Sequence, residues 1–154
     1  MLGFSGAGVT VPSVAVAVGA RRVVWVDALI PVRSGATMPS EDIRSRVASL
    51  IRNGRIADWT TWWGPDAMDE LVPEPRLRAA IRAEGHELPG DFYDVAVPVP
   101  RSWPEDGARY VQLSCAYDGD AARARARGWP VVGDGRGGHL DVATDPLRVA
   151  GLIG

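Results

Sequence analysis

The residues at the start of the chain constrain its fold most strongly. Residues 1–31 are nearly all apolar, and a glycine-rich turn at residues 3–8 (GFSGAG) comes first. Residues 9–20 carry small and β-branched side chains on every face, which predicts a buried helix, and Pro12 fits its first turn. Residues 23–26 (VVWV) are a continuous apolar run, typical of a parallel strand covered on both faces. Turn, helix and strand in this order form half of a βαβ unit, which predicts an α/β fold.

The remaining residues divide into two blocks. Residues 32–107 are rich in proline and tryptophan, with helices expected from Ser40 to about residue 51 and over residues 75–84. Residues 109–154 return to an α/β rhythm. Strands are expected at residues 110–115 and 129–132, and helices at residues 121–127 and 145–153, with Thr144 as a plausible N-cap of the last helix.

Composition excludes several classes of function. The net charge of −2 offers no basic excess to neutralise nucleic-acid phosphates. The single cysteine, Cys115, excludes an internal disulfide framework and a cysteine-based metal cluster, and we expect it to be a buried strand residue. No apolar run reaches the roughly 18 to 20 residues of a membrane helix, and no secretory signal is visible. A cytoplasmic protein without a nucleic-acid or membrane partner is therefore expected.

A serine nucleophile, a histidine base and an acid would together support ester or amide hydrolysis. The pentapeptide from Gly3 to Ala7 matches the strand-to-helix turn G-x-S-x-G that exposes a nucleophilic Ser5, with alanine in the last position. His139 follows a late glycine-rich loop. Each residue also has an ordinary interpretation: Ser5 as a turn residue, and His139 as a brace for the last helix.

The same glycines permit a dinucleotide-binding interpretation. Residues 6–11 begin like G-x-G-x-x-G, and Asp27 lies about 20 residues further on, where an acid could hold a ribose hydroxyl. Val11 stands where the third glycine is needed, however, and almost no strand precedes Gly6. The three tryptophans at positions 59, 62 and 63 could line an acyl pocket, but their spacing equally suits helix packing, which we favour.

The whole chain resembles the C-terminal half of an α/β-hydrolase, beginning at the nucleophile elbow. The segment GFSGAG is similar to that elbow, VVWVDALIP to the next core strand, YVQLSCAYDGDA to the strand that delivers the acid, and GWPVVGDGRGGHLDVATDP to the last strand, histidine loop and closing helix. The resemblance implies a partial α/β-hydrolase fold over residues 1–154. Its core would be residues 1–31 and 108–154, and residues 32–107 would be a helical cap insertion.

The resemblance also implies site residues and an activity. Ser5 would be the nucleophile, His139 the general base and Asp118 the favoured acid, with Asp120 and Asp27 as alternatives. The backbone N–H of Gly6 would supply one oxyanion donor, and the second is not identified. The implied activity is hydrolysis of a small ester or related acyl substrate, with no cofactor or metal. A non-catalytic binding module is the alternative.

The family's strands before the elbow are missing, and Met1 and Leu2 are all that we expect of the strand leading into it. A fragment or misplaced start, a degenerate relative, or a homodimer formed through the unpaired sheet edge would explain this, and we favour the first. Because one oxyanion donor is worth roughly 10²- to 10³-fold in rate, the chain alone is expected to be weak or inactive.

Overall fold

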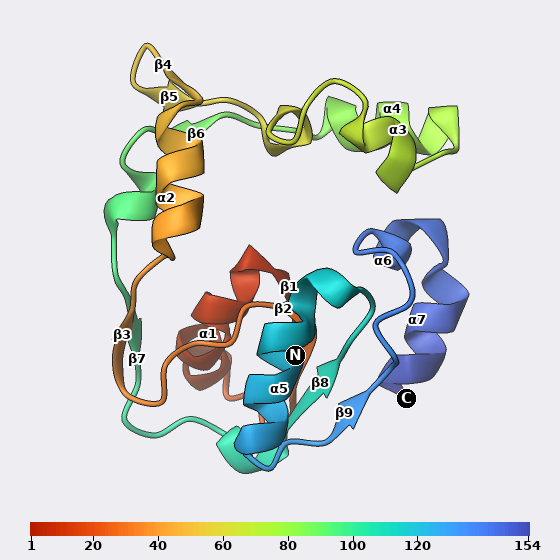
Figure 1. Cartoon of the computed structure of the whole chain (residues 1–154). Helices are drawn as coiled ribbons and strands as arrows, with labels where there is room; N and C mark the ends of the chain where they lie inside the picture. The colour runs from red at the N-terminus through yellow and green to blue at the C-terminus, as the bar shows by residue number, and fades with distance from the viewer. The chain divides into compact units, whose positions relative to one another are not determined.

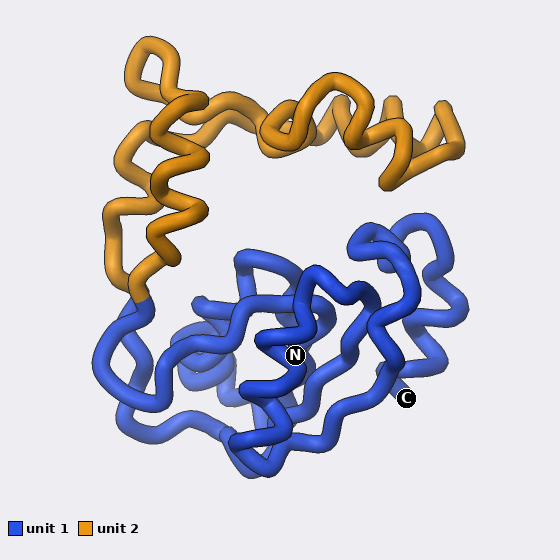
Figure 2. Tube along the Cα trace, in the orientation of Figure 1, with its two compact units in different colours: residues 1–37, 97–154 blue, residues 38–96 orange.

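The computed structural model describes residues 1–154, and the chain forms two compact units (Figure 2). Unit 1 comprises residues 1–37 and 97–154, and unit 2 comprises residues 38–96. The sequence analysis placed the corresponding boundaries at residues 31/32 and 107/108. The structural boundaries enclose a smaller insertion, because the chain on either side of it pairs within unit 1.

A four-stranded parallel sheet forms the centre of unit 1, with strand order β1-β2-β8-β9 (Figure 1). Its strands are β1 (Leu2–Ser5), β2 (Val23–Ala28), β8 (Ala108–Val111) and β9 (Val131–Val132). This parallel sheet with flanking helices confirms the expected α/β fold at that level.

The strand that leads into the glycine-rich turn is present in the structure. β1 has four residues, pairs with β2 from Leu2 opposite Val24 onwards, and forms one edge of the sheet. The expectation of a two-residue remnant was wrong, because Gly3, Phe4 and Ser5 themselves continue the strand into the turn.

Helices cover both faces of this sheet. Helices α1 (Val11–Val18) and α5 (Asp118–Ala126) contribute to an apolar cluster with Trp25, Tyr110 and Trp129. Helix α7 (Pro146–Ile153) contributes to a second cluster that contains Val26 and Val111. Because successive residues of a strand point to opposite faces, a strand covered on both faces carries apolar side chains in succession, as β2 does from Val23 to Val26.

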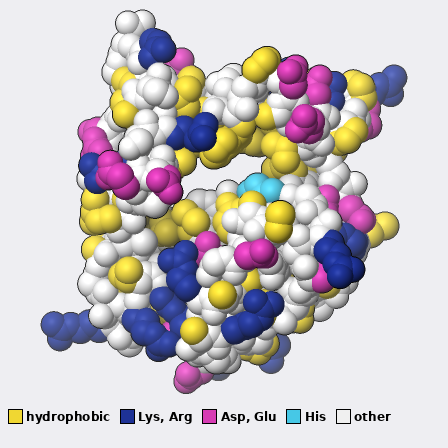
Figure 3. Space-filling view, in the orientation of Figure 1, with side chains coloured by type: hydrophobic (Ala, Val, Ile, Leu, Met, Phe, Trp, Pro, Cys, Tyr) yellow, Lys and Arg dark blue, Asp and Glu magenta, His cyan; other side chains and the backbone are white.

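The outer faces of α1 and α5 differ in chemistry. In α5, Ala121 and Ala124 are buried, whereas Arg123 and Arg125 are exposed. Figure 3 shows arginine side chains gathered on the visible face of unit 1. In α1, by contrast, valines are exposed at positions 14, 16 and 18, the last by 66%. The expectation that α1 is buried all round was therefore wrong, because only one of its faces meets the sheet.

Shorter elements complete unit 1. Strands β3 (Gly35–Thr37) and β7 (Val97–Val99) pair antiparallel where the chain leaves for unit 2 and returns. Unit 1 also contains short helical segments, which are η1 (Gly6–Thr10), η4 (Glu105–Gly107), η5 (Cys115–Tyr117) and α6 (Asp141–Thr144). Asp145, not Thr144, caps α7 by accepting a hydrogen bond from the N–H of Arg148.

Unit 2 has its own small core, in which Val47, Ile56 and Trp62 are buried. Its elements are α2 (Glu41–Ala48), β4 (Ile51–Arg52), β5 (Arg55–Ile56), η2 (Trp59–Thr61), α3 (Ala67–Leu71), α4 (Pro75–Ala83), β6 (Leu88–Pro89) and η3 (Phe92–Asp94). Trp63 is half exposed beneath the guanidinium of Arg46. None of the helices in the structure has the length and apolarity to cross a membrane.

Candidate active site

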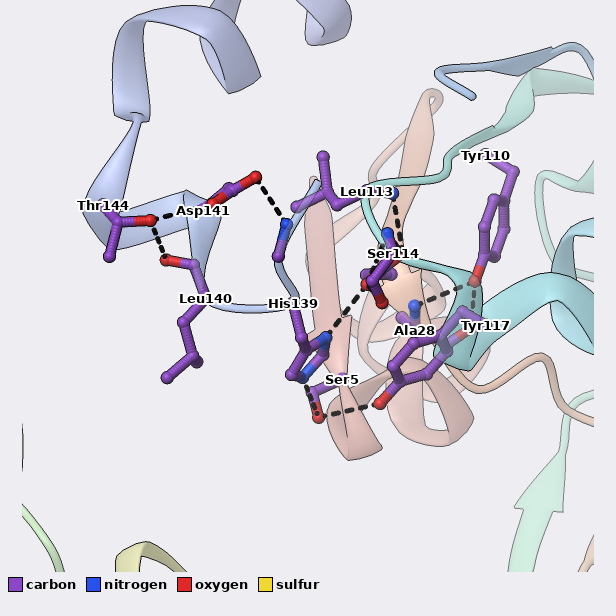
Figure 4. A network of polar contacts seen from close by, with 12 residues as sticks. Ser5, Ala28, Tyr110, Leu113, Ser114, Tyr117, His139, Leu140, Asp141 and Thr144 are labelled. Carbon is purple, nitrogen blue, oxygen red and sulfur yellow. Dashed lines mark hydrogen bonds and ion pairs between the residues drawn. The ribbon is translucent and has the colours of Figure 1, made fainter. Parts of the chain in front are cut away.

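The polar residues of interest in unit 1 meet at the carboxyl ends of the four parallel strands. Ser5 ends β1, Asp27 lies near the end of β2, Ser114 and Tyr117 follow β8, and His139 follows β9. Figure 4 shows Ser5, Ser114, Tyr117 and His139 converging from separate strands and loops. This edge of a parallel sheet is where α/β folds bind their ligands.

Ser5 has a strained backbone conformation, with φ 54° and ψ −134°. Such a conformation in a residue other than glycine costs about 1–3 kcal/mol and is most frequent at functional sites. The turn packs tightly at two glycines: a Cβ at Gly3 would overlap the side chain of Val11, and one at Gly8 would overlap the carbonyl oxygen of Leu29. After the serine, Gly8 is therefore the position that must stay small, whereas Ala7 is exposed.

Ser5, His139 and Asp27 form a continuous hydrogen-bonded series. The Oγ of Ser5 lies 3.1 Å from Nε2 of His139. On the other side of the imidazole, Nδ1 lies 3.1 Å from Oδ2 of Asp27. A serine hydroxyl, an imidazole and a carboxylate are thus hydrogen-bonded in the same order as in serine hydrolases.

Asp27 is completely buried, and both of its carboxylate oxygens accept hydrogen bonds. Oδ1 accepts from the N–H groups of Leu113, at 2.7 Å, and Ser114, at 3.1 Å. Oδ2 accepts from the hydroxyl of Ser114, at 2.5 Å. These bonds offset the cost of burying the carboxylate and fix it against the imidazole.

The backbone directs Asp27 towards His139. Asp27 has a positive φ of 40°, and the register between β1 and β2 shifts beside it, so that Ser5 pairs with Ala28. Such a bulge redirects a side chain relative to the regular strand. Tyr110 fixes Ala28, the last residue of β2. The Tyr110 hydroxyl donates to the carbonyl of Ala28 and accepts from the N–H of Ala28. Burial raises the pKa of Tyr110, so this hydroxyl stays protonated.

The hydrogen-bond series fixes which group donates at each step. With the Asp27 carboxylate as an acceptor, Nδ1 of His139 carries the proton. Nε2 is then the acceptor for the hydroxyl proton of Ser5. The hydroxyl of Tyr117 lies 3.2 Å from Ser5 Oγ, so in this arrangement it donates to that oxygen.

The imidazole of His139 is held between two aromatic rings. The ring of Phe4 stacks on the imidazole with 4.6 Å between centroids, and the ring of Tyr117 stacks on it with 4.8 Å. The interplanar angle is 17° in each case. The side chain of His139 remains 22% exposed, whereas that of Asp27 has no exposure. The imidazole therefore has a fixed orientation and stays partly open to solvent.

The loop that carries His139 is anchored on both sides. The N–H of Gly137 donates to the carbonyl of Leu113, at 2.8 Å. The carboxylate of Asp141 accepts from the N–H of Gly138, the hydroxyl of Thr144 and the guanidinium of Arg148. Burial alone would raise the pKa of Asp141, but these three donors outweigh it, and the pKa lies below its ordinary value.

Asp118, the acid favoured from the sequence, does not contact His139. Its carboxylate is exposed at the start of α5 and accepts from the side-chain amide of Gln112. Asp120 is buried and accepts from the N–H of Ile30. The place expected of Asp118 is occupied by Asp27, the third candidate, because β8 ends before it can carry Asp118 to the histidine.

Other residues singled out from the sequence are also placed. Gly6 directly follows Ser5 and is exposed at the start of η1, where the first N–H groups of a helix have no acceptor within the helix. His86 is exposed in unit 2. Cys115 is exposed in η5, so the expectation of a buried strand residue was wrong.

Phe4, Ser114 and Tyr117 were not expected as site residues from the sequence. Phe4 occupies the variable position before the serine of the elbow, and its side chain gives no signal there. Ser114 and Tyr117 lie within the quoted segment YVQLSCAYDGDA, but only the parallel sheet brings them to Ser5 and Asp27. A search for polar residues at the carboxyl end of every predicted strand would have included Ser114.

The structure does not favour dinucleotide binding at the glycine-rich turn. Asp27 would have to offer its carboxylate to a ribose hydroxyl, but that carboxylate is buried and already bonded to His139, Leu113 and Ser114. No cluster of three or more His, Cys, Asp or Glu side chains suited to a metal ion occurs in the chain.

Comparisons of the chain with protein-family models, with curated proteins and with solved structures each find no match. The geometry at the carboxyl edge of the sheet is therefore the basis for a functional assignment.

Proposed function

We propose that this chain is a serine hydrolase of the α/β-hydrolase type that acts on a small ester or a related acyl substrate. The observation that carries the proposal is the series from Ser5 Oγ through the imidazole of His139 to Asp27, with 3.1 Å at each hydrogen bond. In this assignment Ser5 is the nucleophile, His139 the general base and Asp27 the acid.

Three features outside the series support the proposal. Ser5 sits at a strained strand-to-helix turn, as the nucleophile of this fold does. The order serine, acid, histidine along the chain is that of the family. The site also lies at the carboxyl edge of a parallel sheet.

The reaction follows from the hydrogen bonds. The Oγ of Ser5 forms a bond to the substrate carbonyl carbon while Nε2 of His139 takes its proton, and the carbonyl electron pair moves to the oxygen. Asp27 stabilises the imidazolium through Nδ1. The intermediate then expels the alcohol, which receives its proton from Nε2, and water cleaves the acyl-serine by the same route.

The test is labelling with a fluorophosphonate probe, together with hydrolysis of a p-nitrophenyl ester. The sequence led us to expect a weak or inactive chain, but because Ser5, His139 and Asp27 are joined in one series we expect the unmodified chain to be labelled. Ser5→Ala should abolish both labelling and hydrolysis. Ser102→Ala, which removes an exposed serine of the same unit, serves as the matched control and should change neither. A folded chain that is not labelled would contradict the proposal and favour a non-catalytic binding module.

A further inference from the structure

Tyr117 places a second polar hydrogen at the nucleophile of the proposed hydrolase. It ends η5, just beyond β8, and its hydroxyl lies 3.2 Å from Oγ of Ser5. The two residues are 112 positions apart in the chain, so the contact depends on the fold and not on local sequence.

The direction of this hydrogen bond follows from the rest of the series. Ser5 has a single hydroxyl proton, and Nε2 of His139 is its acceptor. The hydrogen bond between Ser5 and Tyr117 therefore uses the proton of Tyr117. In the resting site, a hydroxyl donor is aimed at the atom that attacks the substrate.

The same donor is within reach of the charge that develops during attack. In the tetrahedral intermediate, Oγ and the oxyanion are bonded to one carbon, so a small rotation of the phenolic O–H moves it from one oxygen to the other. Figure 4 shows the contacts of Ser5 with His139 and with Tyr117 leaving its oxygen in different directions. The contact of His139 with Ser5 therefore leaves the Tyr117 side of Oγ free for the hydroxyl of Tyr117.

The hydroxyl is held in place before substrate arrives. The ring of Tyr117 stacks on the imidazole of His139, at 4.8 Å and 17°. With the ring fixed in advance, only the O–H has to rotate during the reaction, and such a small reorganisation favours strong oxyanion stabilisation.

We propose that Tyr117 is a catalytic residue whose hydroxyl donates to the oxyanion, as the partner of the Gly6 N–H; this inference rests on the proposed function. During attack, the hydrogen bond of Tyr117 switches from Oγ to the oxyanion, and the proton stays on the phenol. When the intermediate collapses, the electron pair returns to the carbonyl and the hydrogen bond is released. The proton balance between Ser5 and His139 is unchanged.

The decisive variant is Tyr117→Phe, which keeps the stacked ring and removes only the hydroxyl. We expect kcat for a p-nitrophenyl ester to fall about 10²- to 10³-fold with little change in KM. The rate of fluorophosphonate labelling should fall in parallel. Tyr93→Phe, in unit 2, is the matched control and should leave both rates unchanged.

A second measurement separates an oxyanion donor from a residue that only positions His139. For an oxyanion donor, the affinity of a trifluoromethyl ketone, which forms a tetrahedral adduct with the serine, falls by the same factor as kcat/KM. The midpoint of the pH–rate profile then stays in place. A shifted midpoint with unchanged inhibitor affinity would overturn the inference in favour of positioning.

The two proposals fail in different ways. A wild-type chain that is not labelled at Ser5 overturns the proposed function and this inference with it. A wild-type chain that is labelled, combined with an equally reactive and equally stable Tyr117→Phe variant, overturns only the role of Tyr117.

Discussion

Asp27 and Asp118, two of the candidate acids, differ in burial and in hydrogen-bond partners. Asp27 is buried, accepts from two backbone N–H groups and the Ser114 hydroxyl, and contacts His139. Asp118 is exposed and bonded to Gln112. Only the first can hold the imidazole in one tautomer.

Replacing each acid by its amide tests this difference. We expect Asp27→Asn to lower kcat by about 10³- to 10⁴-fold, because the amide would accept badly from Nδ1–H and favour the wrong tautomer. Asp118→Asn, the matched control, should leave kcat nearly unchanged. Ester hydrolysis would be measured for both, with thermal unfolding to confirm that Asp27→Asn is folded. Loss of activity in Asp118→Asn but not in Asp27→Asn would reverse the assignment.

The sequence allowed Ser5 and His139 to be selected as partners, and the structure brings them together. The sequence favoured Asp118 among three aspartates that follow predicted strands, whereas the residue that contacts His139 is Asp27. The choice among them depends on the bulge at Asp27 and on where β8 ends, and neither leaves a signal in one sequence. Roles in catalysis stay predictions for all of these residues.

At the scale of elements, the turn between β1 and α1 depends on how closely it approaches β2. A Cβ at Gly8 would overlap the carbonyl oxygen of Leu29 and come within 3.0 Å of Trp25 and of Ala28. Gly119, in the first turn of α5, has nothing within 4 Å of the equivalent position. The two glycines therefore respond in opposite ways to the same added methyl group.

We expect Gly8→Ala to lower the free energy of unfolding by about 1–3 kcal/mol, because the backbone of Leu29 must move. Gly119→Ala should be neutral or raise it by up to about 1 kcal/mol through helix propensity. Urea unfolding of the two variants measures both changes. Equal stability of Gly8→Ala and wild type would mean that the turn is more loosely packed than the structure indicates.

Element types were easier to anticipate than their exposure. The apolar run at residues 23–26 and the glycine-rich turn correctly indicated a parallel strand and a helix start. The helix itself was expected to be buried on every face, yet three of its valines are exposed. Ser13 is the one polar residue of α1, and a single polar residue sets no period that marks the outer face of a helix.

At the scale of the molecule, all the proposed site residues belong to unit 1. Unit 2 is inserted between β3 and β7, where Thr37 and Val97 are paired. The two ends of the insertion therefore lie at hairpin distance from each other. The chain between them can be replaced without stretching the backbone of unit 1.

Replacing residues 38–96 by Asn-Gly would join β3 and β7 through a two-residue turn. We expect the shortened chain to unfold cooperatively and to retain Ser5-dependent labelling by the fluorophosphonate, because the strands and loops of the site are intact. The shortened Ser5→Ala chain is the control. An unfolded or unreactive product would show that unit 1 needs unit 2 to form its site.

The pairing of Thr37 with Val97 also bears on how such a chain can diversify. An insertion bounded by two hydrogen-bonded neighbours can be lengthened, shortened or exchanged by recombination without altering the register of the parallel sheet. Changes of length between residues 38 and 96 therefore leave in place the strands and loops that carry Ser5, Asp27 and His139.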